Sequence, residues 1–160
     1  GRFYYRTGQA ENSESYFVDA FLTRPKNIDA QSALIEILTY KMTYKSPDEV
    51  VQTTREYYEN YEELRRNNAF TSLYASFTLS AASQSYSLGN SVKGREYLDQ
   101  FENIFTDNLE VNTYLISDAY ISAAVHYFGK GNSSLAKRYI NKGLQYSPGN
   151  YQLLQLKQSL

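Results

Sequence analysis

One pattern of residue types occurs near both ends of the sequence. Residues 16–27 and 139–150 both begin with Tyr, end with Asn and carry Pro two positions before that Asn. Ala20 and Gly143 place a small residue at the same offset in each stretch. A pattern repeated over this length indicates a structural unit that the chain uses more than once.

Hydrophobic periodicity predicts that these units are helical. In residues 115–128, apolar and small residues recur at steps of three and four, and no sustained alternation or hairpin turn predicts a strand. Pro25 and Pro148 lie between the expected helices, and Pro47 is the first residue of one, so no proline interrupts a helix interior. Short loops require consecutive helices to lie antiparallel as neighbours, so we expect an all-α protein made of helical hairpins. The expected helices span about 1–6, 10–22, 28–44, 47–65, 68–87, 91–105, 111–128, 133–146 and 150–159.

Local residue chemistry marks several of these helix boundaries. Ser46 can accept a hydrogen bond from the free amides of the helix that begins at Pro47, and Glu49 completes a capping-box sequence. Asn27 and Asn150 each follow a proline by two residues and precede an apolar stretch, which is typical of a helix start. Short Gly/Asn loops separate further helices at 87–90 and 129–132.

The order of small, aromatic, glycine and proline positions resembles the tetratricopeptide repeat, a helix–turn–helix unit of about 34 residues. In residues 117–150 these positions hold Tyr120, Ala123, Ala124, Tyr127, Gly131, Ala136, Ile140, Gly143 and Pro148. In the first unit they hold Gly1, Tyr4, Gly8, Ser13, Phe17, Ala20 and Pro25. A weaker unit begins near Ala75, and residues 28–66 match least.

The resemblance implies a single tetratricopeptide-like domain over residues 1–160, a right-handed α-solenoid of antiparallel helical hairpins. Small residues would let paired helices approach closely, aromatic rings would fill the gaps, and each hairpin would bury its apolar face against its neighbours. The first unit lacks the start of its first helix, which indicates a fragment of a longer protein. The expected units are 1–27, 28–66, 68–108 and 111–148, followed by a terminal helix at 150–159.

Arrays of this family usually bind a peptide or a partner helix in a concave groove lined by the first helix of each hairpin. The resemblance therefore implies a non-enzymatic module for protein–protein interaction or scaffolding, in which tyrosine supplies contact area with a polar tip. The groove lacks the Lys/Asn set with which chaperone-binding members hold a C-terminal carboxylate, so we do not expect chaperone binding. By helical register, the groove residues are Arg2, Tyr5, Arg6, Glu36, Tyr40, Ser83, Tyr86, Asp118, Ser122 and Val125.

Two further interpretations remain open at this stage. The repeats could be a structural spacer, or a docking arm for a neighbouring domain of a larger polypeptide, with no exchangeable ligand, because a fold alone does not define a function. The ends of a truncated solenoid could also associate with one another. The sequence leaves the cellular compartment open.

Composition and the distribution of reactive residues argue against other classes. A net charge of −1 gives no basic field for nucleic acid, and no apolar run approaches the roughly 18–20 residues that span a bilayer. The chain has no cysteine and a single histidine, His126, so it offers no metal-ligand spacing. The acidic residues within 55–66 are expected to form a solvated helix face, with Glu62 paired to Arg66. We therefore expect no enzyme, cofactor or metal, no nucleic-acid partner and no membrane insertion.

Overall fold

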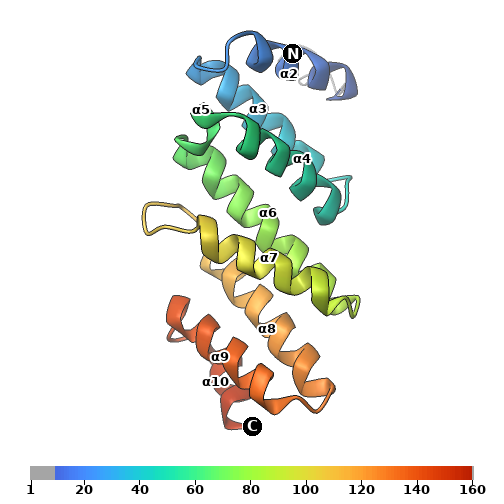
Figure 1. The fold of residues 1–160 in the computed structure, drawn as a ribbon, viewed down its shortest axis with the longest axis vertical. Helices are drawn as coiled ribbons and strands as arrows, with labels where there is room; N and C mark the ends of the chain where they lie inside the picture. The colour runs from blue at the N-terminus through green and yellow to red at the C-terminus, as the bar shows by residue number, and fades with distance from the viewer. Residues whose placement is uncertain (1–9, 160) are drawn as a thin grey trace. The chain divides into compact units, whose positions relative to one another are not determined.

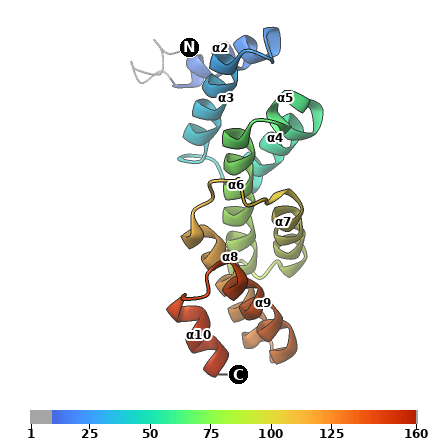
Figure 2. The same cartoon turned by 90° about the vertical axis from the view of Figure 1, so that its left-hand side faces the viewer.

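The computed structural model of the chain describes residues 10–159, with side chains described from residue 13. Within that range the chain forms nine α-helices and no strand, which confirms the all-α prediction (Figures 1 and 2). The expected helix at 1–6 lies outside the described residues. The helices are α2 (Ala10–Thr23), α3 (Ile28–Lys41), α4 (Pro47–Asn60), α5 (Glu62–Arg65), α6 (Asn68–Ser87), α7 (Ser91–Ile104), α8 (Thr113–Gly129), α9 (Ser133–Tyr146) and α10 (Tyr151–Gln158).

The chain divides into two compact units, Gly1–Tyr74 and Ala75–Leu160, and the division falls within α6. We refer to them as unit 1 and unit 2 and describe each by itself. The prediction that residues 1–160 form one repeat domain stays a prediction.

In unit 1, helices α2 and α3 form a hairpin whose core is aromatic and aliphatic. Phe21 is fully buried and lies edge-on to the ring of Tyr61, with 4.8 Å between the ring centroids. The buried Gln31 donates from Nε2 to the carbonyl oxygen of Pro25 at 2.7 Å and accepts from Asn67 Nδ2 at 2.7 Å. This amide thus ties the α2–α3 turn to the start of α6, and its buried polar atoms are satisfied.

The expected helix at 47–65 is interrupted, which corrects the sequence-based boundary. Tyr61 adopts an extended backbone (φ −124°, ψ 108°) between α4 and α5. Arg65 Nη1 donates to the carbonyl oxygens of Tyr58 at 3.0 Å and Glu59 at 2.7 Å, near the end of α4. The break needs no Gly or Pro because a side chain satisfies these carbonyls.

Other boundaries follow the expected local chemistry. Asn27 Oδ1 accepts from the amide of Ala30 at 2.9 Å, and Asn150 Oδ1 accepts from Leu153 at 3.0 Å, so both predicted helix starts are confirmed.

The expected helix at 28–44 ends earlier, at Lys41. The chain must leave the helical conformation before Pro47, and the intervening residues form a turn.

In unit 2, the residues of α6 from Ala75 onward and α7 form one hairpin, α8 and α9 form the next, and α10 follows (Figure 1). Both hairpin loops use the same design, with a glycine in the left-handed region: φ is +81° at Gly89 and +71° at Gly131. The next residue in each loop, Asn90 or Asn132, caps the following helix through its side chain. The two Gly/Asn breaks predicted from the sequence are therefore confirmed.

A glycine sets the close approach of helices within each of these hairpins. A Cβ at Gly94 of α7 would lie 2.7 Å from ring carbons of Tyr86 on α6. A Cβ at Gly143 of α9 would lie 2.8 Å from Leu153 Cδ1 and 2.9 Å from Tyr120 Cβ. Real Cβ contacts are longer than this. Gly143 is therefore required at the observed helix separation, because Tyr120 Cβ is fixed to the backbone of α8, and Gly94 is required for the observed position of the Tyr86 ring.

Candidate partner-binding groove

Three of the residues expected in the groove lie in contact in unit 2. Ser83 of α6 donates from Oγ to Asp118 Oδ2 of α8 at 2.6 Å, and the hydroxyl oxygens of Ser83 and Ser122 lie 2.9 Å apart. Ser83 belongs to the first helix of one hairpin, and the other two belong to the first helix of the next. These side chains therefore place α6 and α8 in contact at this point.

The same face of α8 continues past this polar cluster to an open hollow. Ser122 and Val125 follow Asp118 at helical spacing, and Val125 is 50% exposed. Between α8 and α10 the surface forms a hollow of about 540 Å³. The residues that line it are Ile121, Val125, Gln152, Gln155, Leu156, Gln158 and Ser159.

Sequence analysis identified only Val125 among these lining residues. The signal for Ile121 was present, because it lies three residues after Asp118 and shares its helix face. The lining residues of α10 follow from no sequence pattern, because they face α8 only through the packing of α10 after the second hairpin. We call the surface formed by Ser83, Asp118, Ser122 and the α8–α10 hollow the unit 2 groove.

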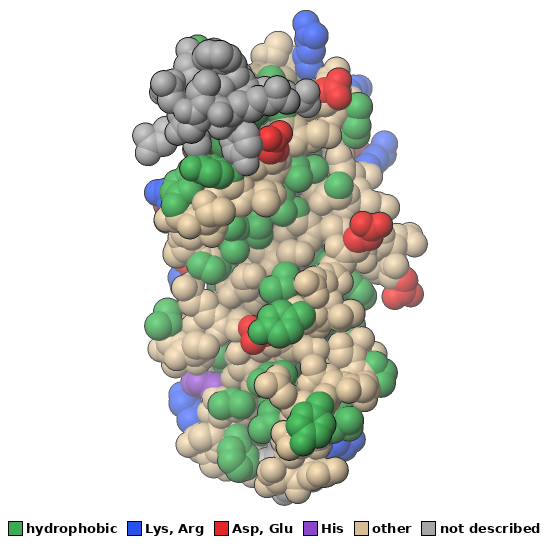
Figure 3. All heavy atoms as spheres, turned by 180° about the vertical axis from the view of Figure 1, so that it is seen from behind, with side chains coloured by type: hydrophobic (Ala, Val, Ile, Leu, Met, Phe, Trp, Pro, Cys, Tyr) green, Lys and Arg blue, Asp and Glu red, His purple; other side chains and the backbone are tan. Residues whose placement is uncertain are grey.

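Charge is distributed unevenly between the helices of the two hairpins. Helix α6 has no charged residue, and α8 has one carboxylate, Asp118, together with His126. Of the second helices, α7 carries charges of both signs, and α9 carries three basic residues and no acidic one. Figure 3 shows a face on which, over its lower part, apolar side chains lie among uncharged polar ones and few charges appear. The unit 2 groove is thus weakly polar, with a single formal negative charge.

Tyr86 does not line the groove, which corrects its predicted placement. Its side chain is 2% exposed and lies with its ring centroid 6.0 Å from those of both Tyr127 and Tyr139. Burial raises the pKa of its hydroxyl above the ordinary value. Register placed Tyr86 beside Ser83, but the absence of a side chain at Gly94 lets the ring turn into the interior of unit 2.

The other predicted groove residues belong to the N-terminal part of the chain. Glu36 and Tyr40 lie on α3 in unit 1, and both are partly exposed. The Tyr40 ring lies 5.3 Å from that of Tyr44, centroid to centroid. Three predicted residues lie outside the described residues: Arg2, Tyr5 and Arg6.

A polar network that the sequence did not reveal joins three helices of unit 2. Glu102 of α7 accepts from Lys142 Nζ of α9 with both carboxylate oxygens, each at 2.6 Å. The hydroxyl of Tyr120 on α8 donates to Glu102 Oε1 at 2.8 Å. Burial, and next the hydrogen bond to Glu102, raise the pKa of Tyr120 above its ordinary value. This network fixes the second helices against α8, and none of its three residues lines the α8–α10 hollow.

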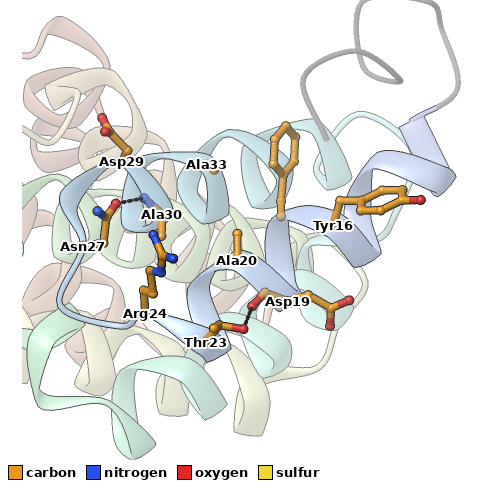
Figure 4. Close-up of a pocket in the computed structure, with 10 residues that line it drawn as sticks. Tyr16, Asp19, Ala20, Thr23, Arg24, Asn27, Asp29, Ala30 and Ala33 are labelled. Atoms are coloured by element: carbon orange, nitrogen blue, oxygen red, sulfur yellow. Dashed lines mark hydrogen bonds between the residues drawn. The ribbon is translucent and has the colours of Figure 1, made fainter.

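Unit 1 has a hollow of its own, of about 650 Å³, between α2 and α3 (Figure 4). Ala20, Ala30 and Ala33 keep it open because their side chains are short, and Arg24 extends toward the first turn of α3. Tyr16 lies at its edge and is 51% exposed. The hollow was not predicted from the sequence.

The acidic residues of 55–66 behave as a solvated helix face. Glu62 Oε1 lies 2.5 Å from Arg66 Nη2, so the predicted pair is confirmed, and Glu59 Oε1 lies 2.7 Å from Arg55 Nε. Exposed pairs of this kind contribute little, about 0.3–0.5 kcal/mol each.

The described residues contain no group of three or more His, Asp or Glu side chains that could hold a metal ion. His126 is half-buried against Tyr86 and Tyr127, with ring centroids 5.5 and 5.2 Å away. Over residues 10–159, none of the helices combines the length and apolar composition of a bilayer-spanning segment.

Comparison with protein-family models, with curated proteins and with solved structures finds no match for this chain.

Proposed function

We propose that this chain is a tetratricopeptide-like, right-handed α-solenoid that acts as a non-enzymatic protein-interaction module. Its repeating unit is the antiparallel helical hairpin. The repeated loop design at Gly89 and Gly131, and the glycines at 94 and 143 where an added Cβ would meet the paired helix, support a unit of this kind. The lateral contact of α6 with α8 through Ser83 and Asp118 supports the stacking of consecutive hairpins.

The unit 2 groove is the surface that we assign to the partner. The observation that carries this assignment is the hollow between α8 and α10, which adjoins a hydrogen-bonded polar cluster on the same face of α8. A concave surface that combines apolar contacts with a few oriented polar groups is the common form of a binding site. Val125, half exposed at its wall, is the apolar contact that we expect a partner to cover.

Selection of peptide ligands tests this function. A phage-displayed library of random 12-residue peptides is selected on the immobilised protein, and synthetic peptides of the enriched sequences are measured by fluorescence polarisation. The protein has no cysteine, so Val125→Cys can be labelled with a bulky maleimide to block the hollow. We expect this label to abolish binding. Val92→Cys is the matched control, because Val92 lies on α7 and is 77% exposed.

The outcomes separate the candidate functions. Loss of binding on labelling Val125→Cys, with binding retained on labelling Val92→Cys, supports the groove. An absence of enriched peptides, or equal effects of the two labels, contradicts it.

The alternative function is a spacer or docking arm for a neighbouring domain of a larger polypeptide, without an exchangeable ligand. The unit 1 hollow favours this reading, since exposed Tyr16 and the alanines of α2 and α3 form a surface that a neighbouring domain could cover. Protection of Tyr16 from hydroxyl-radical labelling in the longer polypeptide, but not in residues 1–160 alone, would support it. Equal labelling in both would count against it.

A further inference from the structure

We propose that the unit 2 groove binds a peptide segment in which a Lys or Arg lies within about three residues of an apolar side chain. This inference rests on the proposed function and specifies the partner for the same groove. The carboxylate of Asp118 would receive the basic side chain, and the α8–α10 hollow would receive the apolar one.

The charge of the groove selects a cationic group. Asp118 is the one carboxylate on α6 and α8, and it is half-buried. Ser83 donates to its Oδ2, and no Lys or Arg pairs with it among the described residues. A partly desolvated carboxylate is stabilised by an opposite charge, and it repels phosphate. A nucleic acid or an anionic lipid headgroup is therefore disfavoured relative to a basic peptide.

The spacing of the two subsites follows from helix geometry. Ile121 and Val125, on the α8 wall of the hollow, lie three and seven residues after Asp118. At a rise of about 1.5 Å per residue, these positions are displaced by about 4.5 and 10.5 Å along the helix axis. An extended peptide advances about 3.3 Å per residue. The apolar residue of the peptide is therefore expected about one to three positions along the sequence from the basic residue.

The α10 wall suits the backbone of a peptide. Gln152, Gln155 and Gln158 line it, and each carboxamide can donate to a carbonyl and accept from an amide. Gln155 Nε2 donates to the hydroxyl of Tyr151 at 2.6 Å, which orients that amide. Leu156 supplies the apolar contact on this side.

The test uses synthetic peptides enriched from the random 12-residue library, measured on the protein and on two variants. Asp118→Asn removes the charge but keeps an oxygen that can accept from Ser83. Asp99→Asn, on the exposed surface of α7, makes the same change in net charge away from the groove. Circular dichroism verifies that both variants are folded. Replacing the basic residue of the peptide by Gln tests the charge without any change in the protein.

We expect enriched peptides to share the basic–apolar pair, and Asp118→Asn to weaken binding about five- to tenfold. Asp99→Asn should change binding less than twofold. Raising the salt concentration should weaken binding to the wild-type protein but not to Asp118→Asn.

One outcome would overturn the inference and leave the proposed function standing. In it, enriched peptides bind the protein and fail to bind labelled Val125→Cys, but they lack a basic residue or bind Asp118→Asn equally well. No enriched peptide at all would overturn both. Self-association that the same label abolishes would assign the hollow to a second copy of the chain and also overturn the inference.

Discussion

Gly143 offers the most quantitative test of how closely the hairpins pack. In Gly143→Ala the added Cβ would lie 2.8 Å from Leu153 Cδ1 and 2.9 Å from Tyr120 Cβ. The first neighbour is the end of a side chain and can move, but Tyr120 Cβ is fixed to the backbone of α8. Relief of that contact requires α8 and α9 to shift, and overpacking of this kind costs about 1–3 kcal/mol.

Helix propensity opposes this cost and must be separated from it. Alanine in place of glycine inside a helix stabilises by about 0.5–1 kcal/mol. Gly129→Ala provides the matched control, because Gly129 is also helical, at the end of α8, and its added Cβ would meet nothing within 4 Å. We therefore expect Gly129→Ala to leave the free energy of unfolding unchanged or to raise it slightly. The free energy of unfolding of Gly143→Ala should be lower than that of Gly129→Ala by about 1–3 kcal/mol.

The assay is urea denaturation followed by circular dichroism, with the free energy of unfolding obtained by linear extrapolation. Equal free energies of unfolding for the two variants, within about 0.5 kcal/mol, or a higher value for Gly143→Ala would refute the steric role of Gly143.

Three further predictions concern the contacts of unit 2. Glu102→Gln leaves Lys142 without its carboxylate partner and should lower the free energy of unfolding by about 1–3 kcal/mol, whereas Asp99→Asn should change it little in the same denaturation assay. The folded chain raises the pKa of Tyr120 above its ordinary value of 10.0, so the unfolded state loses that proton first and stability should fall as pH rises above about 10. Tyr120→Phe should reduce this fall in urea midpoints measured between about pH 8 and 11; an unchanged pH dependence would contradict the assignment. Asn132→Ala should cost about 0.5–2 kcal/mol and Asn132→Ser much less, because serine retains a capping oxygen for α9; equal losses in thermal unfolding would argue against capping.

The sequence predicted features whose cause is local. Asn27 and Asn150 begin helices because an Asn side chain accepts the hydrogen bond that a first-turn amide needs. The small residue at Gly143 was expected to permit close helix approach, and the contacts around it explain why. Helical register assigned Ser83 and Asp118 to the groove, and the hydrogen bond between them depends on the packing of α6 against α8.

Features that depend on distant residues could not be predicted in this way. The break at Tyr61 is stabilised by Arg65, and no Gly or Pro in the sequence marks it. Tyr86 has the register of a surface residue, but it enters the interior through the space beside Gly94. The bridge from Glu102 to Lys142 joins residues on α7 and α9 that no sequence spacing relates.

A disulfide between the first helices of consecutive hairpins tests whether these helices lie side by side. The chain has no cysteine, and the Ser83 and Ser122 hydroxyls lie 2.9 Å apart, so Ser83→Cys/Ser122→Cys brings two thiols within bonding range. Ser76→Cys/Ser122→Cys is the control, since Ser76 lies about 10 Å farther along α6. Thiol titration after mild oxidation should show near-complete disulfide formation in the first pair and little in the control. Free thiols in the first pair, or equal oxidation of both pairs, would contradict the stacking of α6 on α8.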